Sequence, residues 1–197
     1  MRDLIISTAV KLFVKFGYKS VTMDDIANQM CISKKTLYKS YRSKEKLVEE
    51  AACSVKDDLF IKIKDILAWN YDPVRENLEI QKLIIGIYKY IPPASRFELM
   101  KYYPETYFKE IIKQHPKLID YLGQNIEKGI VMGFYLSDLD AKFCAKLTFM
   151  LLTASVDNLK SDYGFSQYPE KIIAYNIRAI ATEKGREALI FAEILSG

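Results

Sequence analysis

The sequence has little of what most catalytic sites require. It contains one histidine, three cysteines and eight glycines among 197 residues. The single histidine, His115, precedes a proline on what we expect to be a surface turn, and no nucleophile motif accompanies it, so a Ser-His-Asp hydrolase has little support. Neither a phosphate-binding glycine loop nor a set of residues with metal-ligand spacing is present. We therefore expect a protein that is not an enzyme and has no cofactor.

The cysteines and the hydrophobic runs bear on the cellular compartment. Cys31, Cys53 and Cys144 are odd in number and widely spaced, which fits reduced thiols in a cytosolic protein better than a disulfide framework. The apolar run at residues 4–6 is followed by lysines and by no small-residue cleavage site, which argues against a signal peptide. No stretch approaches the roughly 18 uninterrupted apolar residues of a membrane span. These features predict a cytoplasmic protein with no membrane partner.

The positive charge is concentrated at one end of the chain. The net charge is +4, from 29 basic and 25 acidic residues. Residues 1–50 hold 10 basic and 6 acidic side chains, a net of +4, and the remaining 19 basic and 19 acidic side chains cancel. This distribution is typical of a nucleic-acid-binding domain joined to a neutral one.

Apolar residues recur at helical spacing along the whole chain, and no strand-like alternation is long enough to predict a sheet. We therefore predict an all-α protein. Helices are expected over residues 3–16, 44–69, 73–92, 96–102, from 104, 116–133, 140–160, 170–181 and 183–195. The helix that begins at residue 104 and the helix at 116–133 could form one kinked helix.

The segment from Thr22 to Leu47 predicts two short helices joined by a tight turn. Thr22 is a suitable N-cap, and Asp25 three residues later completes the pattern of a capping box. The apolar spacing breaks at Cys31, and Ser33 can cap a second helix. Thr22 and Ser33 thus mark the starts of the two helices, and Cys31 marks the turn between them.

The second of these helices divides into an inward and an outward face. Leu37 and Tyr41 are four residues apart and can pack inward, while lysines and a hydroxyl point elsewhere. A short helix of this kind suits the major groove of DNA, with flanking residues on phosphates. The residues that we predict to contact DNA are Thr22, Ser33, Lys34, Lys35, Thr36, Tyr38, Lys39, Ser40 and Lys44.

This segment resembles the helix-turn-helix of the tetracycline-repressor (TetR) family of bacterial transcriptional regulators. The resemblance covers about the first quarter of the chain. It is carried by Leu12-Phe13, Gly17-Tyr18, Thr22, Asp25-Ile26-Ala27, Ser33-Lys34, Thr36-Leu37-Tyr38, Tyr41, Ser43-Lys44-Glu45 and Leu47.

Four positions depart from the family pattern. Cys31 replaces the usual turn glycine, which would strain the turn if a positive φ is required there. Lys35 stands in place of a small residue and Ser40 in place of a common tyrosine, so the preferred DNA sequence cannot be transferred. Tyr41 replaces the usual phenylalanine.

The resemblance implies a two-domain regulator. Residues 1–46 would form the helix-turn-helix domain, and residues 47–197 would form a helical domain for effector binding and dimerisation. The implied function is repression from a palindromic DNA operator, with release by a small-molecule effector.

Aromatic residues are frequent between residues 85 and 150, where most must serve core packing. The resemblance implies a pocket among these helices, which would suit an apolar or aromatic effector. We predict its lining from Tyr88, Phe97, Met100, Tyr103, Tyr107, Phe134 and Phe143.

The dimer interface is expected on the last long helices. The helix at 140–160 is apolar on nearly every side, so burying one side in its own domain leaves another uncovered. Pairing with a symmetry mate would form a four-helix bundle, although the final helix could instead cover this surface. The predicted interface residues are Phe149, Met150, Ala154, Ile173, Ile177 and Ile180, with the outward face of the 140–160 helix left open.

Two other functions remain compatible with the sequence. One is a helical interaction protein whose N-terminal module has lost DNA binding. The other is a DNA-binding protein that responds to no ligand and whose C-terminal domain is purely structural.

Overall fold

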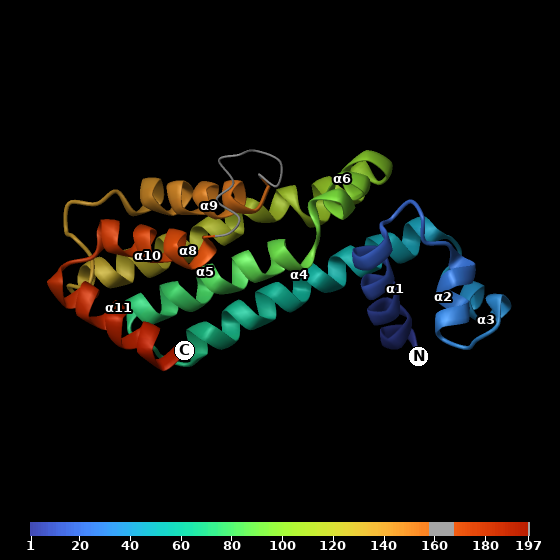
Figure 1. The fold of residues 1–197 in the computed structure, drawn as a ribbon, viewed down its shortest axis with the longest axis horizontal. Helices are drawn as coiled ribbons and strands as arrows, with labels where there is room; N and C mark the ends of the chain where they lie inside the picture. Colours follow the sequence, from blue (N-terminus) through green and yellow to red (C-terminus); the bar gives the residue numbers. More distant parts are fainter. Residues whose placement is uncertain (158–167, 197) are drawn as a thin grey trace. The chain divides into compact units, whose positions relative to one another are not determined.

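The computed structural model describes residues 1–157 and 168–196, and the regular elements within these ranges are helices (Figure 1). The all-α prediction is therefore confirmed. Tyr135 and Ala181 form one isolated antiparallel bridge. The helices are α1 (Arg2–Phe16), α2 (Met23–Gln29), α3 (Lys34–Ser40), α4 (Lys44–Ala68), α5 (Pro73–Tyr90), α6 (Pro93–Tyr102), α7 (Pro104–Glu110), the 3₁₀ helix η1 (Ile112–Gln114), α8 (His115–Val131), α9 (Ala141–Asp157), α10 (Pro169–Ile180) and α11 (Glu183–Ser196).

Helix ends follow the local signals in the sequence. Gly17 ends α1 with a positive φ of 89°, a conformation that glycine adopts without steric cost. Asp72 begins α5, because its Oδ1 accepts the backbone N–H groups of Val74 (2.9 Å) and Arg75 (3.0 Å). None of the described helices combines the length and apolar character that a membrane crossing requires.

The segments at 104 and 116 form two separate helices rather than one kinked helix. α7 ends at Glu110, and η1 lies between it and α8. Pro116 is the second residue of α8, where its missing N–H breaks no intrahelical hydrogen bond. The proline thus starts a helix instead of bending one.

The chain divides into two compact units. Unit 1 consists of Met1–Phe60 and Tyr90–Gln114, and unit 2 of Ile61–Lys89 and His115–Gly197. Unit 1 therefore includes α6 and α7 as well as the N-terminal helices. The expected boundary after residue 46, between DNA-binding and effector-binding segments, stays a prediction about function.

The core of unit 1 is apolar and draws on five helices. Four of them are α1 to α4, and α6 adds Leu99, while Tyr103 and Tyr107 pack against the outside of this core. Phe16, at the end of α1, is 54% exposed. The buried set is Ile5, Ala9, Phe13, Tyr18, Val21, Met23, Ile26, Ala27, Leu37, Tyr41, Leu47, Val48, Ala51 and Leu99.

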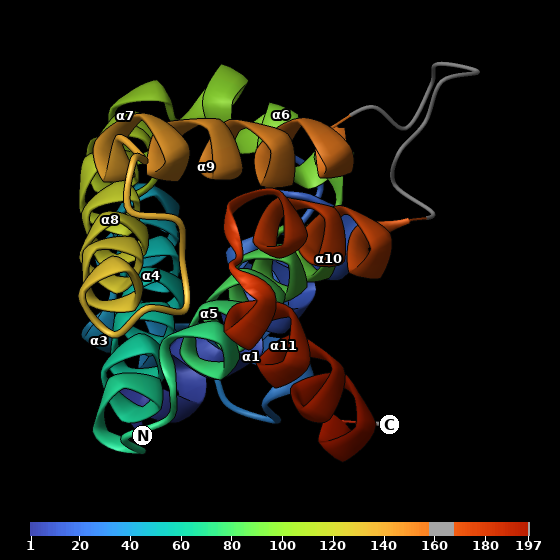
Figure 2. The same ribbon diagram turned by 90° about the vertical axis from the view of Figure 1, so that its left-hand side faces the viewer.

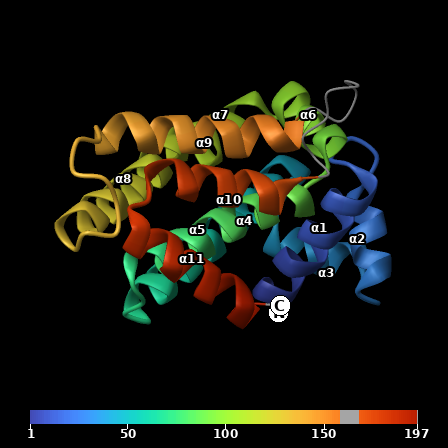
Figure 3. The ribbon, with the colours of Figure 1, turned by 60° about the vertical axis from the view of Figure 1, so that its left-hand side comes forward.

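Unit 2 contains α8 to α11 and nearly all of α5. α8 and α9 lie side by side, and α10 contacts both α9 and α11 (Figures 2 and 3). The inner face of α9 carries Ala145, Phe149 and Leu152, which are buried at helical spacing. The same interior holds Ile177 of α10 and Ile126 of α8.

A chain of polar side chains runs through the interior of unit 2. The carboxylate of Glu76 is buried, and it accepts hydrogen bonds from Asn125 Nδ2 (2.8 Å) and Lys128 Nζ (2.7 Å). Asn125 Nδ2 also donates to the backbone oxygen of Pro73. α5 and α8 are therefore joined by charge-assisted hydrogen bonds as well as by apolar contacts.

The chain continues through Tyr135 to α10. The Tyr135 hydroxyl donates to Pro73 O (3.0 Å) and accepts from Asn77 Nδ2 (3.1 Å), whose own Oδ1 accepts from Gln81 Nε2 (2.8 Å). Asn176 Nδ2 then donates to Gln81 Oε1 (3.3 Å). Sequence periodicity could not reveal this chain, because its members are far apart in sequence.

Candidate nucleic-acid interface

The capping box predicted at the start of α2 is present. Asp25 N–H donates to Thr22 Oγ1 (3.2 Å), and Thr22 N–H donates to Asp25 Oδ2 (2.8 Å). The hydrogen bonds from Thr22 lower the pKa of the Asp25 carboxyl. The Thr22 hydroxyl also donates to Asp25 Oδ2 (2.7 Å), so Thr22 fixes the start of α2. Thr22 is nevertheless exposed at the surface.

The turn between α2 and α3 requires a positive φ, as the replaced glycine suggested. Cys31 has a φ of 54° and is exposed. Its N–H donates to Asn28 O (3.0 Å), and Ile32 N–H donates to Ala27 O (3.0 Å). A side chain in this left-handed region is disfavoured, so the turn is held by its hydrogen bonds and by the helices on either side.

α3 is anchored on one face, as the spacing predicted. Leu37 and Tyr41 are 0% and 1% exposed. Ser33 caps the helix by accepting Thr36 N–H (3.0 Å), and the two hydroxyl oxygens lie 2.8 Å apart. Thr36 is therefore half-buried at the cap, and the outer face of α3 is formed by Lys34, Lys35, Tyr38, Lys39 and Ser40.

The cations on and beside α3 differ in their surroundings. Lys34 Nζ pairs with Asp24 Oδ1 (2.8 Å), but both side chains are well exposed, so the pair is weak and open to competition. The described residues include no ion-pair partner for Lys35 or Lys39. Lys44 Nζ donates to Lys19 O (3.3 Å), and partial burial lowers its pKa.

The end of α3 is tied to α1 and α4 by Tyr41 and by two charged side chains, Arg2 and Glu50, that the sequence pattern did not single out. The Tyr41 hydroxyl donates to Glu50 Oε2 (2.9 Å), and the Arg2 guanidinium donates to both oxygens of that carboxylate (2.5 and 3.2 Å). The hydrogen bond to Glu50 raises the pKa of Arg2 further above its usual value. Tyrosine in place of phenylalanine at position 41 supplies the hydroxyl for this contact.

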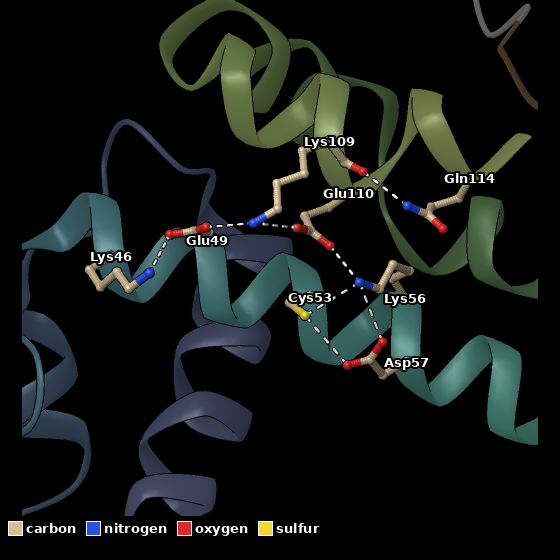
Figure 4. Close-up of polar contacts among 8 residues, drawn as sticks. All are labelled: Lys46, Glu49, Cys53, Lys56, Asp57, Lys109, Glu110 and Gln114. Atoms are coloured by element: carbon tan, nitrogen blue, oxygen red, sulfur yellow. Dashed lines mark hydrogen bonds and ion pairs between the residues drawn. The ribbon is translucent and has the colours of Figure 1, made fainter.

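A ladder of charged side chains joins α4 to α7 within unit 1 (Figure 4). Glu49 pairs with Lys46 (2.6 Å) and Lys109 (2.8 Å), and these hydrogen bonds, that from Lys109 first, lower its pKa to about 2. Glu110 is buried and pairs with Lys56 (2.7 Å) and Lys109 (3.3 Å). The ladder holds α7 against α4.

The residues predicted to line a pocket fall into both units. Tyr103 and Tyr107 pack against the core of unit 1, while Phe97 and Met100 are exposed on α6. In unit 2 Phe143 is exposed on α9. Tyr88 and Phe134 are half-buried there. The pocket therefore stays a prediction.

His115 does not lie on a surface turn, contrary to the expectation. It is half-buried at the start of α8, with Nε2 3.3 Å from the Tyr88 hydroxyl and its ring 4.9 Å from that of Phe149. Burial lowers the pKa of the imidazole. The proline after it had indicated a turn, but α8 begins at the histidine itself.

Four of the six predicted interface residues are buried in this single chain. Phe149, Ile173, Ile177 and Ile180 are buried within the protomer. The isoleucine stripe of α10 packs within its own unit, and the dimer interface stays a prediction. Met150 and Ala154 are exposed, on the opposite side of α9 from Phe149.

Comparison with known proteins relates the chain to bacterial regulators. The profile of the family described as "Bacterial regulatory proteins, tetR family" matches residues 5–51. The HTH-type transcriptional repressor KstR2 of Rhodococcus jostii is 28% identical over 151 residues, which span 72% of this chain and 71% of the relative. The biofilm operon icaADBC negative regulator IcaR of Staphylococcus aureus (strain Newman) is 30% identical over 133 residues, or 65% of this chain and 68% of the relative.

Solved structures extend the likeness beyond the N-terminal helices. A putative transcriptional regulator from Saccharomonospora viridis, in complex with choline, superposes with a TM-score of 0.77 at 16% identity, covering 92% of this chain and 98% of that chain. At this identity the likeness concerns the fold.

Proposed function

The chain belongs to the TetR family of bacterial regulatory proteins and is a DNA-binding transcriptional regulator, and we propose that it represses transcription as a homodimer on a palindromic operator in the cytoplasm. The proposal rests on the way in which α3 is held. Its Leu37 and Tyr41 are buried, and its lysines face solvent. A rigidly held cationic helix of two turns fits the major groove without reorganisation.

The residues predicted to contact DNA have separable roles in this proposal. Lys34, Lys35, Thr36 and Lys39 face the groove. Thr22, Ser33, Tyr38, Ser40 and Lys44 flank it as phosphate contacts. Because Lys35 and Lys39 have no ion-pair partner among the described residues, whereas Lys34 pairs with Asp24, they are the lysines of α3 most available for a base edge.

In vitro selection of duplexes by the purified protein, followed by affinity measurements on the selected duplex, tests the proposal. Lys35→Ala should change the preference at particular base pairs by about 1–3 kcal/mol. Lys44→Ala should weaken all duplexes about equally and reduce the salt dependence by about one phosphate contact. If selection by wild-type protein enriches no sequence and the retention of DNA does not depend on salt, the chain does not act through this face.

We further propose that the homodimer forms through the outer α9 stripe, defined as Phe143, Leu147, Met150 and Ala154. These residues follow helical spacing, and all four are exposed. One recognition helix covers too little DNA for strong specificity, and a two-fold axis would supply the second. Support comes from the exposure of three large apolar side chains on one stripe, which is unusual on a surface that stays in water.

The proposed effector is a small apolar or aromatic molecule that binds the DNA-free form more tightly. Only such a difference in affinity can shift the equilibrium away from the operator. α4 is one continuous helix from Lys44 to Ala68 and contributes residues to both units, so we expect the response to pass along it. A molecule that raises the melting temperature but leaves operator affinity unchanged would contradict this coupling.

A further inference from the structure

α6 contacts α1 and the loop that follows α1, and the sequence of α6 did not predict these contacts. Leu99 is buried in the core of unit 1, and Ser95 Oγ donates to Val14 O at the end of α1 (3.1 Å). Glu98 Oε2 accepts the backbone N–H of Lys19 in the loop after α1 (2.9 Å). α6 therefore has a defined position beside the loop that leads into α2.

The solvent side of α6 carries cations held over aromatic rings. Tyr102 is 40% exposed, and its ring lies 5.4 Å from Lys19 Nζ and 5.5 Å from Lys101 Nζ. Lys101 Nζ is also 5.8 Å from the exposed ring of Phe97. We name Lys19, Phe97, Lys101 and Tyr102 the α6 basic patch. Contact with the rings restrains two long side chains that would otherwise be free, which lowers the entropy cost of placing them on a ligand.

The patch adjoins the expected DNA-facing surface. Lys44, a predicted phosphate contact, donates from Nζ to the backbone oxygen of Lys19 (3.3 Å). Glu45, Glu98 and Asp25 are the acidic groups near Lys44. Each already accepts hydrogen bonds within the protein: Glu45 from Ser43, Glu98 from Lys19 N–H and Asp25 from Thr22 N–H. The ammonium groups of Lys19, Lys44 and Lys101 thus lie near three carboxylates, each of which is already engaged within the protein.

From this arrangement we infer that the α6 basic patch binds backbone phosphates of the operator duplex, in addition to the contacts of α3. The inference rests on the proposed function and extends it to a helix outside the helix-turn-helix. A phosphate is the partner that the charges favour, because a nucleic-acid backbone releases condensed counterions when ammonium groups approach it. The contact would carry no base preference, since neither lysine is on α3.

Salt titrations of DNA affinity provide the test, using the duplex selected by wild-type protein and a duplex of unrelated sequence. Each phosphate contact adds about 0.9 to the slope of log affinity against log salt. Lys101→Ala and the double variant Lys19→Ala/Lys101→Ala should lose about one and two such contacts per protomer on both duplexes. Between 50 and 200 mM salt, one contact corresponds to an affinity change of about 3.5-fold.

Matched variants separate charge from packing. Lys101→Arg should keep the wild-type slope. Lys113→Ala is the control, because its ammonium also lies over an exposed ring, that of Phe108 (5.4 Å), but on η1 rather than beside Lys19. Circular dichroism melting of each variant should match wild type, because the substituted side chains are exposed.

The possible outcomes are distinct. Wild-type slopes in the double variant would overturn the inference while leaving the proposed function intact. A double variant with wild-type slopes but weaker self-association in sedimentation would make the patch a contact between protein copies, which also overturns it. If wild-type protein binds neither duplex, the proposed function fails and the inference fails with it.

Discussion

In unit 1 the buried side chains are mainly apolar and lysines cover the outer face of α3, whereas in unit 2 a chain of carboxylate, amide and hydroxyl groups crosses the interior and the outer α9 stripe is apolar. The two surfaces suit different partners. Ammonium groups in water attract an anionic backbone over some distance. Apolar side chains gain only when another apolar surface covers them.

The interiors differ in what they require of the chain. An apolar core tolerates exchange among side chains of similar volume. A buried polar chain needs each donor and acceptor to be matched, because an unmatched group costs about 1–3 kcal/mol. Every buried side-chain nitrogen and oxygen in the described residues has a partner. The packing of α5 against α8 and α10 is therefore more strictly specified than the packing of the helix-turn-helix.

The largest expected effect is the difference between an arginine placed in the interior of unit 2 and one placed on its surface. Ile177→Arg would place a charge at a fully buried position and should cost about 4 kcal/mol or more, enough to unfold the unit. Met150→Arg, at a position that is 57% exposed, should preserve folding and yield monomers with weakened operator binding. Chemical denaturation and sedimentation of both variants measure the contrast, and a folded Met150→Arg dimer would contradict the proposed interface.

The second prediction compares the buried carboxylates of the two units. Lys128→Met leaves Glu76 without its ammonium partner and should destabilise the protein by about 3 kcal/mol. Lys56→Met should cost about half as much, because Lys109 still lies 3.3 Å from Glu110. Urea unfolding of the two variants checks the ratio. Equal losses would show that the remaining lysine in unit 1 gives no compensation.

The third prediction concerns the turn before α3. Cys31→Gly should stabilise unit 1 by about 0.5–1 kcal/mol, because glycine adopts a positive φ without strain. The control is Asn28→Gly, which lies inside α2 and should destabilise by roughly 0.3 kcal/mol, the difference in helix propensity between asparagine and glycine. Opposite signs in thermal unfolding are expected, and a loss of stability in Cys31→Gly would mean that the thiol makes a favourable contact.

The smallest effect is the acid response of the ladder between α4 and α7. The folded pKa of Glu49 is about 2, below its ordinary 4.5. Its contribution is therefore complete above pH 4.5 and is lost as the pH falls towards 2. Glu49→Gln should flatten the fall in unfolding free energy over that range, and high salt should have a similar effect because the pair is partly exposed. An unchanged pH profile would contradict the ladder.

Local features were predictable from the sequence because their partners are close along the chain. The capping box of Thr22 and Asp25, the inward face of Leu37 and Tyr41, and the positive φ at Cys31 each depend on a few neighbouring residues. The face that α9 presents to solvent could not be predicted, because Phe149 and Met150 are both apolar and adjacent. The same holds for Leu99, which is buried in a core formed by residues that precede it by more than forty positions.

Unit 1 is discontinuous in sequence, and this affects how the protein is made. On the ribosome the first 60 residues emerge before Leu99 and the rest of α6, which complete the core. At about 5–20 residues per second, the chain takes roughly 2–8 s to grow from residue 60 to residue 99. During that interval the nascent helix-turn-helix exposes the apolar surface that α6 later covers. A fragment cut at residue 60 would keep this surface exposed.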